Sequence, residues 1–345
     1  MYVYTEGHSR IAGTGIYLPE ERITSRDLMR EIQSQERFGV SYEWLERVTG
    51  IREKRVTPQG ILPSDMAVAA AREAMERAKI TAREIDTIIY TGLTRDYLEP
   101  ATAHLVQAKL VAPNATVFDI SNACHGFMNG IHVMDALIAT GQVRNGLVVT
   151  GEQGSLFARR AIEALGKATE RAQLTPLAAG PTLGDAGAAV VMGPKKAPEY
   201  GLVGFMQLSR GQHAHYCTSG GPLKEGPLVT DMPGIIAQTI KLMVPIFQDF
   251  LYERLKWNIH DISKYIMHQT GHRTFRLHAK LGGIPTDIMP DTVTTLGNLI
   301  TATFPVNLHL LHVNREVKEQ DKIFLSGAGS GITVSQAGLV WDAAA

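Results

Sequence analysis

The sequence contains little cysteine and no excess of either charge. Only Cys124 and Cys217 occur among 345 residues, too few for a disulfide framework, so intracellular thiols are the simpler expectation. Lys plus Arg and Asp plus Glu balance at 34 each, which gives no overall field that would attract nucleic acid or an anionic membrane. The composition therefore excludes a disulfide-stapled scaffold and a strongly basic nucleic-acid binder.

The chain also lacks the usual marks of a targeted, membrane-spanning or linker-divided protein. The first residues, MYVYTEGHSRIAG, do not have the basic-then-apolar order of a signal peptide. No stretch approaches the roughly 18 uninterrupted apolar residues of a membrane span. No low-complexity or Pro/Ser-rich segment separates mobile domains. We expect a globular, cytoplasmic protein that binds neither a membrane nor nucleic acid.

Strands and helices alternate in two similar halves of the chain. In the first half, an amphipathic helix at 65–79, with Ser64 as its N-cap, precedes the apolar strand IDTIIYTGL. In the second half, a long helix at 235–255 precedes the strand KYIMH. The strands are apolar enough to be covered on both faces. This pattern predicts a layered α/β core shared by the halves 1–193 and 194–345.

Cys124 stands where a strand at 115–120 gives way to a helix with apolar residues at helical spacing from Phe127 onward. Unpaired N–H groups and the dipole at a helix N-terminus stabilise a thiolate, the reactive form of cysteine. The alternative is a small buried residue, which is how free cysteine most often occurs. Cys217, in HYCTSGG, has no comparable setting and is expected to be structural.

Two further polar residues follow or precede predicted elements in the second half. His268 ends the strand in KYIMHQTGH, and catalytic groups gather at the carboxyl ends of strands in α/β sheets. Asn298 lies just before a predicted helix, where an ordinary N-cap or turn residue is the alternative interpretation. The alternative interpretation of His268 is a core histidine whose ring is hydrogen-bonded to the backbone. A metal site with His272 is disfavoured because Gly271 interrupts any shared helix and no carboxylate follows at the required spacing.

The glycine-rich stretch SGAGSGIT, residues 326–333, is followed by the strand-like ITVSQAGLVW. A dinucleotide-binding fingerprint must open a helix, so this stretch is not one. A glycine turn between strands can instead direct a backbone N–H at a developing oxyanion. The order Cys, His, Asn also occurs in papain-like proteases, but their signature around an N-terminal cysteine is absent here.

Seven segments occur in one order from about residue 10 to the C-terminus: GTGIYLPEERIT, ERVTGIREKRV, FDISNACHGFMNG, LGDAGAAVVM, IMHQTG, TLGNLITATFPVNL and SGAGSGIT. In this combination the chain resembles the thiolase superfamily, specifically its β-ketoacyl-ACP synthase III-like branch. The resemblance implies a five-layered αβαβα thiolase-like fold built from two similar halves, and a homodimer.

The resemblance also implies the roles of individual residues. Cys124 would be the acylated nucleophile, and His268 and Asn298 the polar pair opposite it. The backbone N–H groups of Cys124 and Gly329 would form the oxyanion hole. The branch often has an aromatic residue where this chain has Ala328, so the pocket above the nucleophile is expected to be wider. HQTG also replaces the usual HQAN, with the histidine and glutamine kept.

The segment TGLTRDYLEPATAH, residues 91–104, resembles the corresponding loop of OleA-type enzymes, which condense two fatty acyl-CoA molecules head to head. In that group the loop glutamate acts as a base in the partner subunit's site, and the matching residue here is Glu99. The ordinary alternative is a solvated loop carboxylate. The resemblance thus implies an acyltransferase that uses acyl-CoA or acyl-ACP substrates and requires no cofactor or metal.

Two other functions remain open from the sequence. One is a decarboxylating synthase III-type enzyme that uses a malonyl thioester, as in polyketide or secondary metabolism, with an acyl carrier protein as its partner. Decarboxylation generates the carbanion directly, so His268 and Asn298 would suffice and Glu99 would be dispensable. The other is a non-catalytic acyl-binding scaffold that keeps the fold, against which the intact Cys, His and Asn argue.

Overall fold

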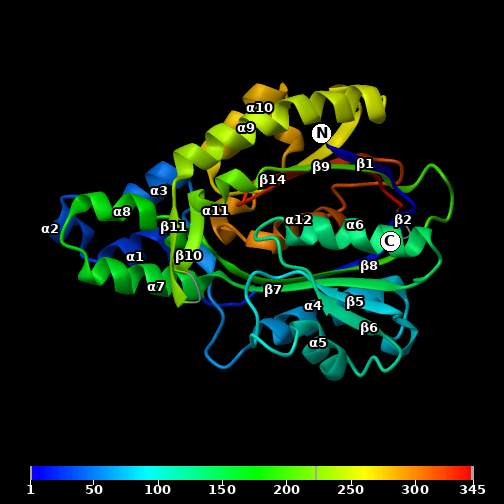
Figure 1. The fold of residues 1–345 in the computed structure, drawn as a ribbon, viewed down its shortest axis with the longest axis horizontal. Coiled ribbons are helices and arrows are strands. Elements are labelled where there is room, and N and C mark those ends of the chain that lie inside the picture. Colours follow the sequence, from blue (N-terminus) through cyan, green and yellow to red (C-terminus); the bar gives the residue numbers. More distant parts are fainter. Residues whose placement is uncertain (1, 222–223, 343–345) are drawn as a thin grey trace.

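The fold is layered around two helices that lie between two five-stranded sheets. A computed structural model describes residues 2–221 and 224–342. Figure 1 shows the layers from bottom to top: outer helices, a sheet, the central helices, the second sheet and further outer helices. The central pair is α6 (Gly126–Ala139) and α12 (Thr303–Val313), both largely apolar and buried. This is the five-layered αβαβα arrangement that the sequence predicts.

The two sheets have the same number of strands and mixed directions. In the lower sheet, the pairs β5–β6 and β5–β7 are parallel and the other neighbours are antiparallel. In the upper sheet, only β12–β13 is parallel. The lower sheet has the order β2 (Ser9–Tyr17), β8 (Asp185–Pro194), β7 (Gly146–Gln153), β5 (Thr87–Tyr90), β6 (Thr116–Asp119); the upper has β1 (Val3–Glu6), β9 (Gly201–Ser209), β14 (Thr333–Val340), β13 (Lys322–Gly329), β12 (Ile262–Met267).

Helices cover the outer face of each sheet, and a smaller lobe projects from one end (Figure 1). The outer helices are α4 (Pro63–Ala78) and α5 (Thr102–Leu110) below, and α9 (Met232–Gln248) and α10 (His272–Gly282) above. The lobe contains α1 (Ser25–Glu31), α2 (Ser34–Phe38), α3 (Trp44–Thr49), α7 (Gly154–Lys167), α8 (Leu174–Leu177) and the hairpin β10 (Cys217–Gly221) with β11 (Lys224–Thr230).

Short elements complete the connections between these layers. The small ladder of β3 (Arg22–Thr24) and β4 (Glu53–Arg55) is antiparallel, and α11 (Val293–Leu296) contacts β4. A π-helical turn, η5 (Asp249–Arg254), continues α9. The 3-10 turns are η1 (Ala82–Glu84), η2 (Arg171–Gln173), η3 (Gly180–Thr182), η4 (Gly211–Tyr216), η6 (Ile259–Asp261), η7 (Thr286–Ile288) and η8 (Ile300–Ala302).

Two local expectations from the sequence are wrong. Ser64 is not the N-cap of the first amphipathic helix, because that helix begins one residue earlier, at Pro63, with Leu62 at the cap position. Ser64 instead donates its hydroxyl hydrogen to Asp96. The strand before Cys124 is not covered on both faces either: β6 is the last strand of its sheet, and Phe118 within it is 37% exposed.

Glycines allow helix α4 to lie directly on the lower sheet. Alanines face the sheet from α4, and the glycines opposite leave no space for a side chain. A Cβ added at Gly15 would lie 2.1 Å from the carbonyl oxygen of Ala70, and one at Gly187 would lie 2.3 Å from that of Met66. Atoms at such distances overlap, so the backbone of α4 fixes the lower face of the sheet.

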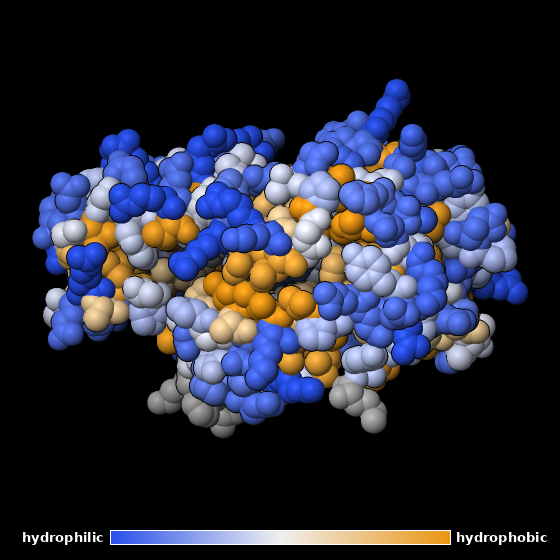
Figure 2. Space-filling view, turned by 90° about the horizontal axis from the view of Figure 1, so that it is seen from above, coloured by the Kyte–Doolittle hydropathy of each residue, from blue (hydrophilic) through white to orange (hydrophobic). Residues whose placement is uncertain are grey.

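Helix α9 and its π-helical continuation form an unusually apolar outer element. The segment Met232–Arg254 is long and apolar enough to cross a membrane by length and composition, and 28% of its most apolar window is buried. Figure 2 views the molecule from the side of α9 and shows hydrophobic residues gathered in the middle of this face. A core helix of a globular protein passes the same test, so this finding alone assigns no membrane role.

We predict that Gly15→Ala lowers the free energy of unfolding by about 1–3 kcal/mol, because the added methyl group overlaps the backbone of α4. Gly166→Ala is the matched control: it lies in helix α7 with no neighbouring atom within 4 Å, so it should be neutral or stabilise by about 0.5–1 kcal/mol. Urea unfolding followed by circular dichroism measures both. Equal stability of the two variants would contradict the close approach.

Candidate active site

Cys124 lies on a tight turn between strand β6 and helix α6. Ala123 has a φ of +45°, a region that alanine rarely adopts. The N–H of His125 donates to the carbonyl of Asn122 at 3.0 Å, and that of Gly126 donates to the carbonyl of Ala123 at 3.1 Å. Such strain costs on the order of 1–3 kcal/mol and persists only where the surroundings impose it. The turn places the cysteine at the start of a buried helix, as the sequence predicts.

Apolar side chains from several segments surround the thiol. The buried side chains of Phe157, Leu183 and Ile300 form a cluster, against which the partly buried Cys124 packs together with Leu93 and Leu228. They come from α7, the segment before β8, η8, the loop after β5, and β11. The residue as a whole is half-buried, and its thiol lies in an apolar setting.

This setting raises the pKa of Cys124, contrary to the expectation of a stabilised thiolate. Burial is the main cause, and the proximity of Cys217 and Glu152, which would repel a thiolate when ionised, adds to it. Helix α6 begins only at Gly126, so the helix N-terminus does not outweigh the loss of water. The resting residue is a protonated thiol.

Cys217 belongs to this environment, which the sequence did not indicate. It opens strand β10, its thiol forms a hydrogen bond with Ser330, and it lies close enough to Cys124 to raise the pKa of that thiol. Burial raises the pKa of Cys217 as well. The two cysteines of the chain thus lie in one region, although 93 positions separate them in the sequence.

His268 follows directly after strand β12, at its carboxyl end, as predicted. Its side chain is 6% exposed, and its backbone N–H donates to Ser326 at 3.1 Å. Among the described residues, Nδ1 of His268 has no hydrogen-bond partner. Burial lowers the pKa of His268 to about 4, with a smaller contribution from His125. The imidazole is therefore neutral at physiological pH.

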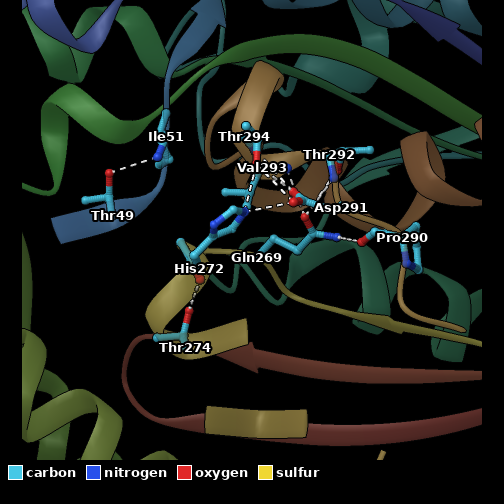
Figure 3. Close-up of polar contacts among 11 residues, drawn as sticks. Thr49, Ile51, Gln269, His272, Thr274, Pro290, Asp291, Thr292, Val293 and Thr294 are labelled. Carbon is cyan, nitrogen blue, oxygen red and sulfur yellow. Dashed lines mark hydrogen bonds and ion pairs between the residues drawn. The ribbon is translucent and has the colours of Figure 1, made fainter. Parts of the chain in front are cut away.

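Gln269 connects the end of β12 to the segment that leads to Asn298 (Figure 3). Its Nε2 donates to the carbonyl of Pro290 at 2.8 Å, and its Oε1 accepts from the N–H groups of Thr292 and Val293. Three backbone groups of this short segment are thereby bonded to the residue after His268. The glutamine of HQTG has a structural explanation that its polarity next to a strand end could have suggested.

His272 does not join His268 in a common site. Figure 3 shows its ring pointing toward Asp291 and Thr294. Its Nε2 lies 2.8 Å from Oδ2 of Asp291 and 2.8 Å from Oγ1 of Thr294. The contact between His272 and Asp291 instead joins the N-terminus of α10 to the segment before α11. The metal alternative with His268 therefore has no geometric support.

Asn298 is held on both sides by backbone bonds. Its N–H donates to the carbonyl of Thr182 and its carbonyl accepts from Gly184, each at 3.0 Å. Its side-chain Oδ1 accepts from the N–H of Ile300 at 2.9 Å. This is the turn that the sequence offers as an alternative and not an N-cap, because Leu299 and Ala302 hold the cap positions of η8 and α12. The bond also fixes the amide so that Nδ2 is the group available to donate.

The structure brings the predicted residues from both halves into one region. Ile300, held by Asn298, packs against Cys124, while His125, the neighbour of Cys124, acts electrostatically on His268. Gly329 ends strand β13, and a Cβ added there would lie 2.8 Å from the Cβ of His125. The segments that carry Cys124, His268, Asn298 and Gly329 thus lie next to one another.

Glu99 lies apart from this centre, in an exposed loop. Its neighbours Tyr97 and Leu98 are 56% and 95% exposed. The loop begins beside Cys124, where Glu152 accepts hydrogen bonds from the N–H groups of Leu93 at 2.8 Å and Thr94 at 3.1 Å. The placement fits a residue that reaches beyond its own subunit, and it also fits a solvated carboxylate.

Glu152 is a buried carboxylate that the sequence analysis missed. Besides the loop N–H groups, it accepts from the hydroxyl of Thr301, three residues after Asn298. Burial raises its pKa, against the effect of these donors. The sequence feature that could have indicated this residue is a charged side chain at the end of the apolar strand GLVVTGE. Its carboxylate ties the loop that carries Glu99 to the segment that carries Asn298.

Comparisons with known proteins agree with this fold and site. The family model described as 3-oxoacyl-(acyl-carrier-protein) synthase III matches residues 118–211, and that of its C-terminal part matches residues 252–341. A structure of OleA from Xanthomonas campestris superimposes with a TM-score of 0.91 at 29% identity and covers 97% of this chain and 98% of its own. The fold is therefore that of the thiolase superfamily.

Two curated relatives span nearly the whole chain. "Beta-ketoacyl-ACP synthase III 3" of Streptomyces coelicolor is 30% identical and covers 97% of this chain and 98% of its own length. "Acyl-CoA:acyl-CoA alkyltransferase" of Xanthomonas campestris is 31% identical, with 96% and 98% covered. The chain belongs to the β-ketoacyl-ACP synthase III family and is an acyltransferase, as the resemblance implied.

The raised pKa of Cys124 predicts how its reactivity depends on pH. In a Cys217→Ser background, the rate of alkylation by iodoacetamide should rise about tenfold per pH unit from pH 7 to 9, because only the thiolate reacts. Peptide mass spectrometry locates the adduct. A rate that is already constant at neutral pH would mean that the thiolate is the resting form and would contradict this account.

Proposed function

We propose that this acyltransferase joins two fatty acyl-CoA molecules in a Claisen condensation, through an acyl-Cys124 intermediate, to a β-keto product. The observation that carries the proposal is the adjacency of the segments that hold Cys124, His268 and Asn298. The similarity to acyl-CoA:acyl-CoA alkyltransferases over nearly the full length supports the choice of both substrates. A related OleA variant has been crystallised with lauric acid and lauroyl-CoA, which favours fatty acyl chains.

In the first half-reaction, the sulfur of Cys124 attacks the thioester carbonyl of the first acyl-CoA. A bond forms between sulfur and the acyl carbon, the bond to the CoA sulfur breaks, and CoA leaves as a thiol that carries the proton lost by Cys124. The backbone N–H groups of Cys124 and Gly329 stabilise the oxyanion, where one such donor is worth about 3 kcal/mol. The apolar side chains around the sulfur suit an acyl chain.

In the second half-reaction, the carbonyl of another acyl-CoA lies against His268 and Asn298. Neutral His268 and Nδ2 of Asn298 donate hydrogen bonds to its oxygen as enolate charge develops. Glu99 of the partner subunit removes the α-proton, since an unactivated acyl thioester needs a positioned base. The carbanion forms a bond to the acyl carbon, the bond from that carbon to the sulfur of Cys124 breaks, and the departing thiolate takes up the proton that Glu99 removed.

The homodimer that this step requires has support on the surface of the monomer. Strand β6 is the edge strand next to the nucleophile turn, and Phe118 in it is 37% exposed. The Glu99 loop carries the exposed side chains of Tyr97 and Leu98. An edge strand beside exposed apolar groups favours pairing with a second copy. We assign this face to the dimer and expect each subunit to supply Glu99 to its partner.

The runner-up is a decarboxylating synthase that extends an acyl-Cys124 with a malonyl thioester. The observation in its favour is the relative from Streptomyces coelicolor, whose name specifies an ACP-dependent synthase. It needs His268 and Asn298 but not Glu99. Four further expectations from the sequence also remain proposals. They are the division into halves at residue 193, the cytoplasmic location, the absence of a cofactor or metal, and the choice between CoA and ACP.

Incubation with acyl-CoA alone tests which reaction occurs. Intact-protein mass spectrometry should find one acyl group on Cys124, and a β-keto product should form without malonyl thioester. Glu99→Gln should reduce product formation by about a hundredfold or more, as loss of a general base does. It should leave acylation of Cys124 unchanged.

The exposed Glu31→Ala is the matched control and should keep full activity. Turnover that requires malonyl thioester and survives Glu99→Gln would favour the decarboxylating enzyme. No adduct on Cys124 would favour a non-catalytic scaffold.

Mixed dimers test whether Glu99 acts across the interface. Cys124→Ala and Glu99→Ala homodimers should each be inactive. After they are mixed and exchange subunits, about a quarter of the wild-type activity should return, because half of the dimers then contain one intact site of two. If Glu99 acts within its own subunit, the mixture stays inactive, and sedimentation analysis confirms that exchange took place.

A further inference from the structure

His125 follows the nucleophile directly, is fully buried, and has no role in the reaction described above. We infer that His125 is a positioning residue that holds the two backbone donors of the oxyanion hole in register, by linking the Cys124 turn to strand β14 through Ser335. The inference rests on the proposed acylation of Cys124. It adds to the proposed function because it identifies the side chains that join the two halves of the chain beside the reacting carbonyl.

Both ring nitrogens of His125 are engaged. Its Nδ1 lies 2.9 Å from Oδ1 of Asn129, and its Nε2 lies 2.7 Å from Oγ of Ser335. Oδ1 of Asn129 can only accept, so Nδ1 carries the hydrogen. Nε2 therefore accepts from the hydroxyl of Ser335. One neutral tautomer satisfies both partners, in agreement with burial that lowers the pKa of His125 to about 4.

The same side chain of Asn129 fastens the turn from both sides of the nucleophile. Its Oδ1 accepts from Nδ2 of Asn122 at 2.7 Å as well as from His125. Its Nδ2 donates to Oε1 of Gln207 at 3.1 Å, on β9. Asn122 and His125 flank Ala123, whose positive φ requires such support. The amide on α6 thereby keeps the strained turn in place.

The other side of His125 packs against the strand that supplies the second donor. A Cβ added at Gly327 would lie 3.3 Å from its Cδ2, and one at Gly329 would lie 3.0 Å from its backbone N. Ser335 lies opposite Gly327 in the antiparallel pair β13–β14. The bond from Ser335 to His125 therefore fixes the distance between the Gly329 segment and the Cys124 turn.

This arrangement excludes His125 as the acid or base of the reaction. Both nitrogens are bonded to protein groups inside the core, and the side chain has no exposed surface. A residue that acts only through position should affect the step in which an oxyanion forms. It should not affect a reaction of the same sulfur that forms none.

Two reactions of Cys124 separate these cases. Acylation by acyl-CoA passes through an oxyanion, whereas alkylation by iodoacetamide is a displacement at carbon without one. In Ser335→Ala we expect the acylation rate constant to fall about ten- to a hundredfold, because misplacement by less than an ångström has effects of this size. The alkylation rate should change less than about twofold, and KM should be nearly unchanged.

His125→Ala should show the same pattern. The double variant His125→Ala/Ser335→Ala should be acylated no more slowly than either single variant, because each of them removes the same hydrogen bond between His125 and Ser335. His132→Ala is the matched control. This histidine lies on the same helix, is half-buried, and bonds to Thr5 and stacks on Phe205, away from the turn. It should acylate at the wild-type rate, and thermal melts verify folding of every variant.

Unchanged acylation in Ser335→Ala overturns the inference, as does a parallel loss of acylation and alkylation, which would indicate general disruption of the turn. Wild-type protein that takes up no acyl group contradicts the proposed function itself. These outcomes are distinct, because the first two require an active wild-type enzyme.

Discussion

The central constraint on this molecule is that the residues proposed to react come from both halves of the chain and must meet between two sheets. Cys124 belongs to the lower sheet and the start of α6, whereas His268 and Gly329 belong to the upper sheet. Helices α6 and α12 fill the space between, with most of their apolar residues buried. Because such an interior is close-packed, a shift of either sheet is transmitted to the site.

Burial also determines the electrostatic character of the site. The groups around the sulfur are kept neutral: the pKa of Cys124 is raised, and those of His125 and His268 are lowered to about 4. Neutral donors near a carbonyl oxygen require no counter-charge before the reaction, and they stabilise negative charge strongly when it appears in an apolar setting. The buried Glu152 is compatible with this because several donors surround it.

The sequence predicts the layers and the placement of Cys124, His268 and Asn298, because these depend on local periodicity and on strand ends. It does not predict the raised pKa of Cys124, since apolar groups from five separate segments create it. Cys217, Glu152 and Gln269 were overlooked or considered structural for the same reason: their partners are distant in the chain. The edge position of β6 depends on strand order, which periodicity alone does not contain.

The glycine-lined contact between α4 and the lower sheet has a consequence for how substrate preference could change over evolution. That side of the molecule has no spare volume, so larger residues at Gly15 or Gly187 are forbidden there. The walls near the sulfur that are free to vary in size come from elsewhere: Leu228 on the β10–β11 hairpin, Phe157 on α7 and Leu93 in the loop after β5. A change of preference toward longer or shorter acyl chains would therefore require substitutions at these three residues, while the glycines under α4 stay unchanged.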